Sequence, residues 1–252
     1  MGRSVVLAGA ARCPRCSLPP RWCVCDALPP VETGLNVHVL IHRGEQGKPS
    51  STGRLVARVV TGAACHPFQR QTRFVTATGF PTGAVESGGE LWILHPCGDP
   101  LPQGPAEHTS AATTAVPAAP ESTAAADGPR RSRRHVLLLD GTWRQAGEML
   151  RTVEVTGRCV RLPDASDDRS RYWLRDQPAP MRLSTAEALM GVLRSVGEHE
   201  AEHRLRLHFE LHVYATLLAR GRREMAERYL GHSPLPNAAA EALDRLHACK
   251  HG

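Results

Sequence analysis

The sequence predicts an α/β protein with a mostly parallel sheet and helices on both faces. Two observations support this fold class. Apolar runs of strand character are followed by stretches of helical periodicity, and this order repeats along the chain. Several of the apolar runs are almost uninterrupted, which is typical of strands buried on both faces. At 252 residues, the chain is also long enough to bury a sizeable core.

The individual elements follow from these patterns. The strand candidates lie at residues 35–42, 91–96, 135–140 and 158–162, with a weaker candidate at 65–70. Helical periodicity is found at residues 52–62, 142–153, 184–197, 200–230 and 238–249. Because helices follow the first and fourth strands directly, we expect neighbouring strands to pair in parallel.

The chain divides into a short segment and one interrupted domain. Residues 12–30 are rich in cysteine and proline, and residues 35–252 carry the α/β pattern. Within that domain, residues 98–134 are of low complexity and have almost no large apolar side chains. Such a stretch cannot bury enough surface to offset the entropy lost on ordering. We therefore expect a disordered insertion inside the domain.

Charge and hydropathy suggest the kind of partner. The net charge of +6 comes almost wholly from arginine, since Lys48 and Lys250 are the only lysines. Arginine suits a polyanion such as RNA, although a GC-rich genome gives the same composition. No window approaches the roughly 20 apolar residues that cross a bilayer. The N-terminal stretch does not resemble a cleaved signal peptide, so we expect a cytoplasmic protein without a membrane partner.

Four cysteines in "CPRCSLPPRWCVC" predict a metal site. Cys13 and Cys16 form a C-x-x-C pair, and Cys23 and Cys25 form a C-x-C pair after a gap of six residues. Four thiolates at this spacing suit a tetrahedral structural zinc. Two disulfides or an iron–sulfur cluster are the alternatives, and disulfides are unusual in a cytoplasmic protein.

Polar residues follow the first strand, where open parallel sheets bind ligands. The stretch "KPSSTGRL" begins a helix with three hydroxyl groups and a glycine. Free N–H groups at a helix start bind anions, although a single hydroxyl would be enough for an N-cap. We expect a ligand carboxylate or phosphate here, bound by Ser50, Ser51, Thr52, Gly53 and Arg54.

A carboxylate and an indole occupy the end of the fourth strand, in "LLLDGTWRQAGEML". Asp140 ends the strand, and Gly141 and Thr142 lead into a helix that begins with Trp143. If the site takes a flat ring, Trp143 stacks on it while Asp140 accepts a proton. The alternative is that Asp140 or Thr142 caps the helix and Trp143 fills core space.

A third polar stretch is "RYWLRDQPAPMRLSTAEALM". Its residues Ser184, Thr185 and Glu187 match a capping box at a helix start. Upstream, Arg171, Tyr172 and Arg175 suit an RNA or nucleotide face, although isolated residues of these types are more often solvated surface.

Taken in order, these motifs resemble the DTW-domain proteins, which are tRNA-uridine aminocarboxypropyltransferases. The resemblance covers about residues 12–220 apart from the insertion. The Asp-Thr-Trp motif reads Asp140-Gly141-Thr142-Trp143 here, with an inserted glycine. Where many members have Ser-Asn-Thr-Gly, this chain has Ser at position 51, which removes an amide but keeps the hydroxyls and the glycine.

The resemblance implies a SPOUT-like fold with a C-terminal knot, S-adenosylmethionine as donor and a tRNA uridine as acceptor. It implies that Asp140 removes the N3 proton and that the helix start near Gly53 anchors the donor's carboxylate. The residues assigned to the donor are Ser50, Ser51, Thr52, Gly53, Arg54, Gly141, Thr142, Ser184, Thr185 and Glu187. Those assigned to tRNA are Trp143, Arg171, Tyr172 and Arg175, with the arginines of 204–223.

Two rival functions remain open at this point. One is an RNA methyltransferase that uses the same donor on the same fold, because the sequence pattern does not decide which carbon bonded to sulfur is presented. The other is a non-catalytic zinc-ribbon protein that binds RNA. The tRNA position and the oligomeric state are not predicted.

Overall fold

Five parallel strands form the centre of the protein. The computed structural model describes residues 11–68, 89–102, 134–152, 157–163, 170–174 and 183–248. Within these residues, the sheet has the order β2-β1-β4-β3-β5, and every strand pair is parallel. The strands are β1 (Asn36–His42), β2 (Ala64–Phe68), β3 (Leu91–Pro100), β4 (His135–Asp140) and β5 (Arg158–Arg161). The predicted parallel sheet is therefore confirmed.

The helices follow the predicted stretches, with one break. They are η1 (Pro20–Trp22), α1 (Thr52–Val59), α4 (Trp143–Thr152), α5 (Thr185–Ser195), α6 (His199–Ala219), α7 (Arg223–Leu230), α8 (Leu235–Ala238) and α9 (Ala240–Ala248). The stretch 200–230 was predicted as one helix, but it is divided between α6 and α7. Gly221 has a φ of 72°, a left-handed conformation that ends α6 and turns the chain.

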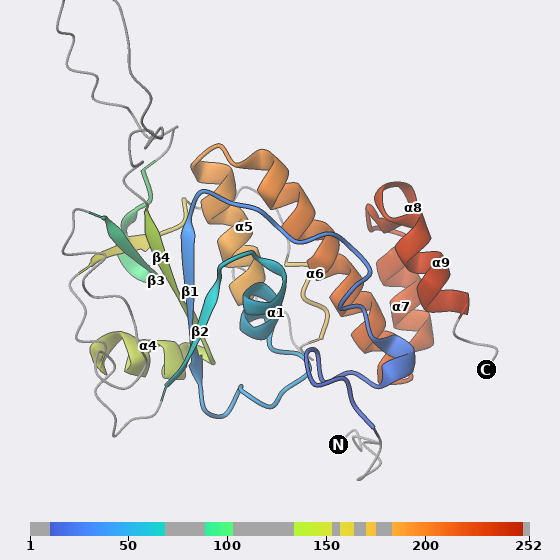
Figure 1. Cartoon of the computed structure of the whole chain (residues 1–252). Helices are drawn as coiled ribbons and strands as arrows, with labels where there is room; N and C mark the ends of the chain where they lie inside the picture. Colours follow the sequence, from blue (N-terminus) through green and yellow to red (C-terminus); the bar gives the residue numbers. More distant parts are fainter. Residues whose placement is uncertain are drawn as a thin grey trace, which may run out of the picture.

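Helices cover both faces of the sheet. In Figure 1, α1, α5 and α6 lie on one side of the strands and α4 lies on the other. The larger core cluster includes Val37 and Val39 of β1, and the smaller one joins Leu40 of β1 to Ala146 and Met149 of α4. Successive β1 residues thus enter different cores, which explains why the strand reads as a continuous apolar run.

The third strand is longer than expected. The predicted strand ended at residue 96, and the low-complexity insertion was expected to begin at residue 98. In the structure, Asp99 and Pro100 pair with β5 after a register shift, and Leu101 is buried. A Cβ on Gly98 would lie 2.5 Å from the backbone carbon of Cys159, so the close approach of the two strands requires glycine.

The other expectations about overall architecture lie beyond what the structure tests. Residues 103–133 of the predicted insertion are outside the described residues, and its disorder remains a prediction. The C-terminal knot also remains a prediction. Among the helices in the described ranges, none combines the length and the apolar character needed to cross a bilayer.

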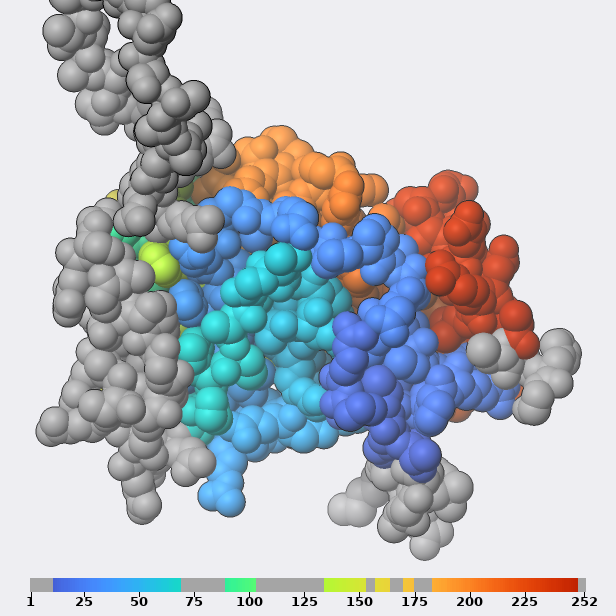
Figure 2. Space-filling view, in the orientation of Figure 1, coloured from blue at the N-terminus to red at the C-terminus, as the bar shows by residue number. Residues whose placement is uncertain are grey.

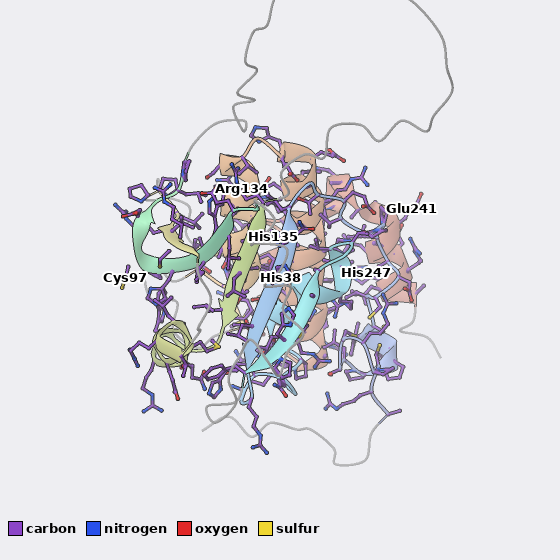
Figure 3. All side chains as sticks on the ribbon, turned by 60° about the vertical axis from the view of Figure 1, so that its left-hand side comes forward. His38, Cys97, Arg134, His135, Glu241 and His247 are labelled. Carbon is purple, nitrogen blue, oxygen red and sulfur yellow. The ribbon has the colours of Figure 1, made fainter. Side chains whose placement is uncertain are left out.

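A row of buried histidines crosses the sheet on the side of α4. His38 of β1 lies between His66 of β2 and His135 of β4, and its Nδ1 and Nε2 atoms are 3.3 Å and 3.2 Å from ring nitrogens of those neighbours. Figure 3 shows His38 and His135 on adjacent strands. Burial and the two neighbouring rings lower the pKa of His38 to about 4. His38 is therefore neutral near pH 7, and its hydrogen bonds to the two neighbouring rings satisfy polar groups inside the sheet.

Candidate functional site

Asp140 joins three segments that are distant in the sequence. It ends β4, and its Oδ2 accepts a hydrogen bond from the Ser51 hydroxyl at 2.7 Å. Its Oδ1 accepts from the Gly53 backbone N–H at 3.2 Å and from the Thr185 hydroxyl at 2.5 Å. The carboxylate therefore lies at the start of α1 and at the start of α5 together.

Local sequence explains why α1 begins at this point. Ser51 is the N-cap of α1, and its Oγ accepts a hydrogen bond from the Arg54 backbone N–H at 3.1 Å. The same hydroxyl donates to Asp140, so Ser51 caps the helix and binds the carboxylate at once. The N-cap alternative is thus correct for Ser51 and does not exclude a second role.

The start of α5 has the capping box that its sequence predicts. The Ser184 side chain accepts from the Glu187 N–H, and the Glu187 carboxylate accepts from the Ser184 N–H at 2.7 Å. The two helix starts also contact each other, since the Ala186 N–H donates to the Thr52 hydroxyl at 3.4 Å. Ser184 and Glu187 therefore fix the direction of α5, and the adjacent Thr185 points its hydroxyl at Asp140.

Burial and hydrogen bonding act in opposite directions on Asp140. Only 6 % of the residue is exposed, and this burial raises the pKa of its carboxyl above the ordinary value. The hydrogen bonds from Thr185, Ser51 and Gly53 lower that pKa, while the charge of Glu45 raises it further. The net shift is upward, so Asp140 is a stronger proton acceptor than an exposed aspartate.

The anion position at the start of α1 is filled by the protein itself. The sequence predicted that these N–H and hydroxyl groups bind a ligand carboxylate or phosphate. In the structure, the Gly53 N–H and the Ser51 hydroxyl point at Asp140. Negative charge at a helix N-terminus is favourable, so the starts of α1 and α5 stabilise the Asp140 carboxylate as they would stabilise a ligand anion.

Asp140 does not cap the helix that follows it. The Thr142 N–H donates to Gln145 Oε1 at 2.7 Å, and the Gln145 N–H donates to Thr142 Oγ1 at 3.4 Å. Thr142 and Gln145 therefore form a second capping box at the start of α4, and the T-x-x-Q spacing is its sequence signal. Gly141 packs against Gln145, where a Cβ would meet the side chain at 3.0 Å.

Trp143 lies on the surface beside this corner. It is 41 % exposed, and among the described residues it is the one large hydrophobic residue that is exposed. The interpretation that Trp143 fills core space is therefore wrong. An exposed indole three residues from a buried carboxylate is available to contact a flat ligand.

The Arg54 side chain binds the cysteine segment. Its guanidinium donates to the Ser17 hydroxyl at 2.9 Å and to the Arg15 carbonyl at 3.3 Å, both in the cysteine segment. The sequence grouped Arg54 with the donor-binding residues because it adjoins Gly53. The geometry gives it a different partner, since residues at successive positions of a helix start point in different directions.

Arg171 and Tyr172 were expected on an RNA face but are engaged inside the protein. Arg171 makes a two-point ion pair with Glu210 of α6, at 3.0 and 2.8 Å, and its guanidinium lies 4.1 Å from the centre of the Tyr229 ring. The Tyr172 hydroxyl donates to the Ser50 carbonyl.

These contacts support the site indirectly. Tyr172 holds the loop before α1, and Arg171 fixes the chain beside Glu187 through its backbone N–H at 2.7 Å. Glu210 is buried, and its position within a largely apolar stretch of α6 was the sequence signal for such a partner. Arg175 lies outside the described residues.

The four N-terminal cysteines form a candidate metal centre. Their sulfur atoms all lie within 4.8 Å of one another, with Cys13 and Cys25 at 3.7 Å and Cys16 and Cys23 at 3.8 Å. In a regular tetrahedron with Zn–S bonds of about 2.3 Å, sulfur atoms are about 3.8 Å apart. The four thiols are not joined in disulfides, and their arrangement fits a single tetrahedral ion such as zinc.

A tight turn positions the first cysteine pair. The Cys13 N–H donates to the Leu18 carbonyl and the Ser17 N–H donates to the Cys13 carbonyl, both at 2.8 Å. Ser17 has a φ of 60°, so the turn passes through the left-handed region. Burial raises the pKa of Cys13, but backbone hydrogen bonds from Cys16 and Arg15 outweigh it and bring the pKa to about 6. The turn therefore favours the thiolate that a metal needs.

The cysteine segment packs on the rest of the protein. Cys16, Leu18, Val24 and Cys25 are buried in the larger core cluster. Figure 2 shows the segment in dark blue against the main body, next to the red C-terminal helices. The Arg245 side chain of α9 donates to the Ala27 carbonyl at 3.3 Å, which agrees with this placement.

Comparison with known proteins places the chain in a family. A family model described as the DTW domain matches residues 10–217, a span that includes the cysteine segment, Asp140 and both helix starts. No solved structure was found to match the chain. The family match supports a general role in tRNA modification. Because the matched span is more than half of the sequence, the chain belongs to the DTW-domain family.

Proposed function

We propose that the protein is a tRNA-uridine aminocarboxypropyltransferase. It transfers the 3-amino-3-carboxypropyl group of S-adenosylmethionine to N3 of a tRNA uridine and releases methylthioadenosine. The observation that carries this proposal is the pairing of Asp140, buried and with a raised pKa, with the exposed indole of Trp143 at the end of a central parallel strand. Open α/β sheets bind their ligands at such strand ends.

The reaction needs one proton acceptor and accurate positioning. The uridine N3–H loses its proton, N3 forms a bond to the propyl carbon next to sulfur, and the carbon–sulfur bond breaks. The electron pair of that bond goes to the positively charged sulfur, which leaves as a neutral thioether. Because the donor is already activated by its charge, the protein contributes mainly orientation and proton removal.

Asp140 is the proposed proton acceptor, and its surroundings suit both of its charge states. When ionised, it accepts hydrogen bonds from Ser51, Gly53 and Thr185. After protonation, its O–H has the Ser51 and Thr185 hydroxyl oxygens as neighbours, and hydroxyls accept as well as donate. A uridine proton therefore reaches Asp140 directly or through one of these hydroxyl groups.

The starts of α1 and α5 are the proposed donor side of the site. Three of the residues expected to bind the donor contact Asp140: Ser51, Gly53 and Thr185. Four more adjoin these residues or Asp140 along the chain: Ser50, Thr52, Gly141 and Thr142. We assign Ser184 and Glu187 to holding the start of α5, because both are used in its capping box. We assign Arg54 to the cysteine segment, where its guanidinium is bound.

The exposed side of α4 is the proposed acceptor side. Trp143 stacks on the uracil ring, and bases stack well on exposed aromatic side chains. Arg144 is exposed next to it, and Arg151 lies two turns further along the same helix. Arg144 and Arg151 line a hollow of about 400 Å³ with Glu148 and Thr152. Two arginines beside a stacking residue suit the phosphates that flank a bound nucleotide.

The mass of the product tests this proposal against methyl transfer. Unmodified tRNA is incubated with the protein and S-adenosylmethionine, then digested to nucleosides and weighed. Aminocarboxypropyl transfer adds about 101 Da to uridine, whereas methyl transfer adds about 14 Da. A product 14 Da heavier replaces the proposal with an RNA methyltransferase. The absence of any product, together with undetectable binding of S-adenosylmethionine, leaves a non-catalytic RNA-binding protein.

A further inference from the structure

Two arginines of α1 face the cysteine segment. Arg54 and Arg58 are four residues apart and therefore share one side of the helix. Arg54 binds the turn between the first two cysteines, through the Ser17 hydroxyl at 2.9 Å and the Arg15 carbonyl at 3.3 Å. The helix that supplies these arginines is the one whose first residues bind Asp140.

Arg58 lies one turn along α1 from Arg54. Its Nε atom is buried and has no hydrogen-bond partner among the described residues. Arg58 is therefore a cation with an unpaired buried nitrogen, on the side of α1 from which Arg54 binds the cysteine turn.

A metal-loaded cluster explains why these charges are placed here. Four thiolates and one divalent ion carry a net charge of roughly −2. Burying that charge is costly unless positive groups lie nearby, and a partly buried arginine with an unpaired nitrogen is costly for the same reason. Arg54 and Arg58 together offset the charge of a four-thiolate centre.

We propose that Arg54 and Arg58 are positioning residues that couple the metal centre to the start of α1, so that metal binding orders the residues that hold Asp140. Helix α1 connects the two places directly. Its Arg54 side chain binds the cysteine turn, while the Arg54 backbone N–H caps onto Ser51, which in turn binds Asp140. One residue therefore links the cysteine turn to the catalytic corner.

The rate of zinc release tests, without any substrate, whether the two arginines stabilise the metal centre. Full-length zinc-loaded protein is mixed with a chromogenic chelator, and the rate of metal release is followed for the wild type, Arg54→Ala, Arg58→Ala and Arg54→Lys. Outer-shell partners of a metal site typically change metal affinity about 10- to 100-fold. We expect Arg54→Ala and Arg58→Ala to release zinc at least about tenfold faster. Arg54→Lys keeps the charge and should fall between Arg54→Ala and the wild type.

The matched control is Arg194→Ala. Arg194 is a partly exposed arginine of α5 that pairs with Glu202, so its removal changes the net charge by the same amount at a different place. If Arg54→Ala and Arg58→Ala release zinc at the same rate as Arg194→Ala, Arg54 and Arg58 do not stabilise the metal centre and the proposal is overturned. A purified protein that folds normally without metal overturns it as well.

Hydrogen exchange in the wild-type chain tests whether metal binding orders the start of α1. Backbone amides of residues 53–56 are compared in the zinc-loaded protein and after zinc removal. We expect faster exchange at these amides without zinc, and slower exchange again when zinc is restored. Unchanged exchange at 53–56 shows that the metal does not order the start of α1. Neither measurement uses tRNA or S-adenosylmethionine, so failure of the proposed reaction leaves both results interpretable.

Discussion

Gly53 and Asp140 are in such close contact that no side chain fits between them. A Cβ built on Gly53 would lie 2.5 Å from Cγ of Asp140, well inside the distance at which carbon atoms repel. This contact lets the Gly53 N–H reach the carboxylate, and it connects the "SSTG" motif of α1 to the aspartate of β4 across 87 residues.

Gly53→Ala should displace Asp140. The added methyl group overlaps the carboxylate, and overpacking of a buried site typically costs about 1–3 kcal/mol of unfolding free energy. We expect a lower melting temperature and a loss of transferase turnover larger than the loss of stability explains. Gly47→Ala is the control, because a Cβ there meets nothing within 4 Å. Equal melting temperature and turnover in Gly53→Ala and Gly47→Ala would show that the surroundings of Asp140 accommodate the added methyl group.

Asp140→Asn should abolish proton removal while leaving the corner folded. The amide oxygen still accepts from the Gly53 N–H and the Thr185 hydroxyl, and the amide N–H₂ donates to the Ser51 hydroxyl. We expect turnover to fall by roughly 10² or more, with little change in the dissociation constant of S-adenosylmethionine. The exposed Asp244→Asn is the control for charge. Turnover close to wild type in a well-folded Asp140→Asn protein removes Asp140 from the chemistry.

Trp143→Ala should affect tRNA and leave stability nearly unchanged. The indole is 41 % exposed, so little core packing is lost. Base–aromatic stacking contributes about 1–3 kcal/mol per base, which corresponds to a KM for tRNA roughly ten- to a hundredfold higher. Trp143→Phe keeps a ring and should be milder. If Trp143→Ala instead lowers the melting temperature and leaves the KM for tRNA unchanged, the residue is structural.

Arg171→Ala should lower the stability of the fold, and its effect should not be limited to weaker tRNA binding. It leaves Glu210 charged, buried and without its two-point partner. Breaking a buried ion pair in this way typically costs about 3–5 kcal/mol of unfolding free energy. Arg171→Ala combined with Glu210→Gln should recover part of that loss. Wild-type melting of Arg171→Ala, with weaker tRNA binding, would return Arg171 to the RNA face that its sequence suggested.

Deletion of residues 103–128 should leave the fold and the reaction intact. The predicted insertion began at residue 98, but Asp99 and Pro100 belong to β3, and Leu101 is buried at 3 % exposure. A deletion that begins at residue 103 keeps these contacts, whereas one that begins at residue 98 removes part of the sheet. We expect unchanged melting for the first deletion and poor soluble expression for the second. Melting temperature and expression yield check both.

The sequence by itself determined the features that depend on near neighbours along the chain. Apolar runs such as "HVLLLD" located the buried strands, because a strand covered on both faces has no polar side. The spacing of Cys13, Cys16, Cys23 and Cys25 predicted a metal site that the sulfur positions fit. Ser184 and Glu187 predicted a capping box, since that motif closes within three residues.

Only the tertiary structure decided which partners the polar side chains have. Arg54 adjoins Gly53 in sequence but binds the cysteine turn, and Arg171 looked like a surface residue but pairs with Glu210. The sequence likewise placed Asp140 at a corner without showing that Ser51 and Thr185 bind it. Periodicity records which side of an element is buried. It does not record which distant element packs there, and a long side chain or a carboxylate takes its partners from that element.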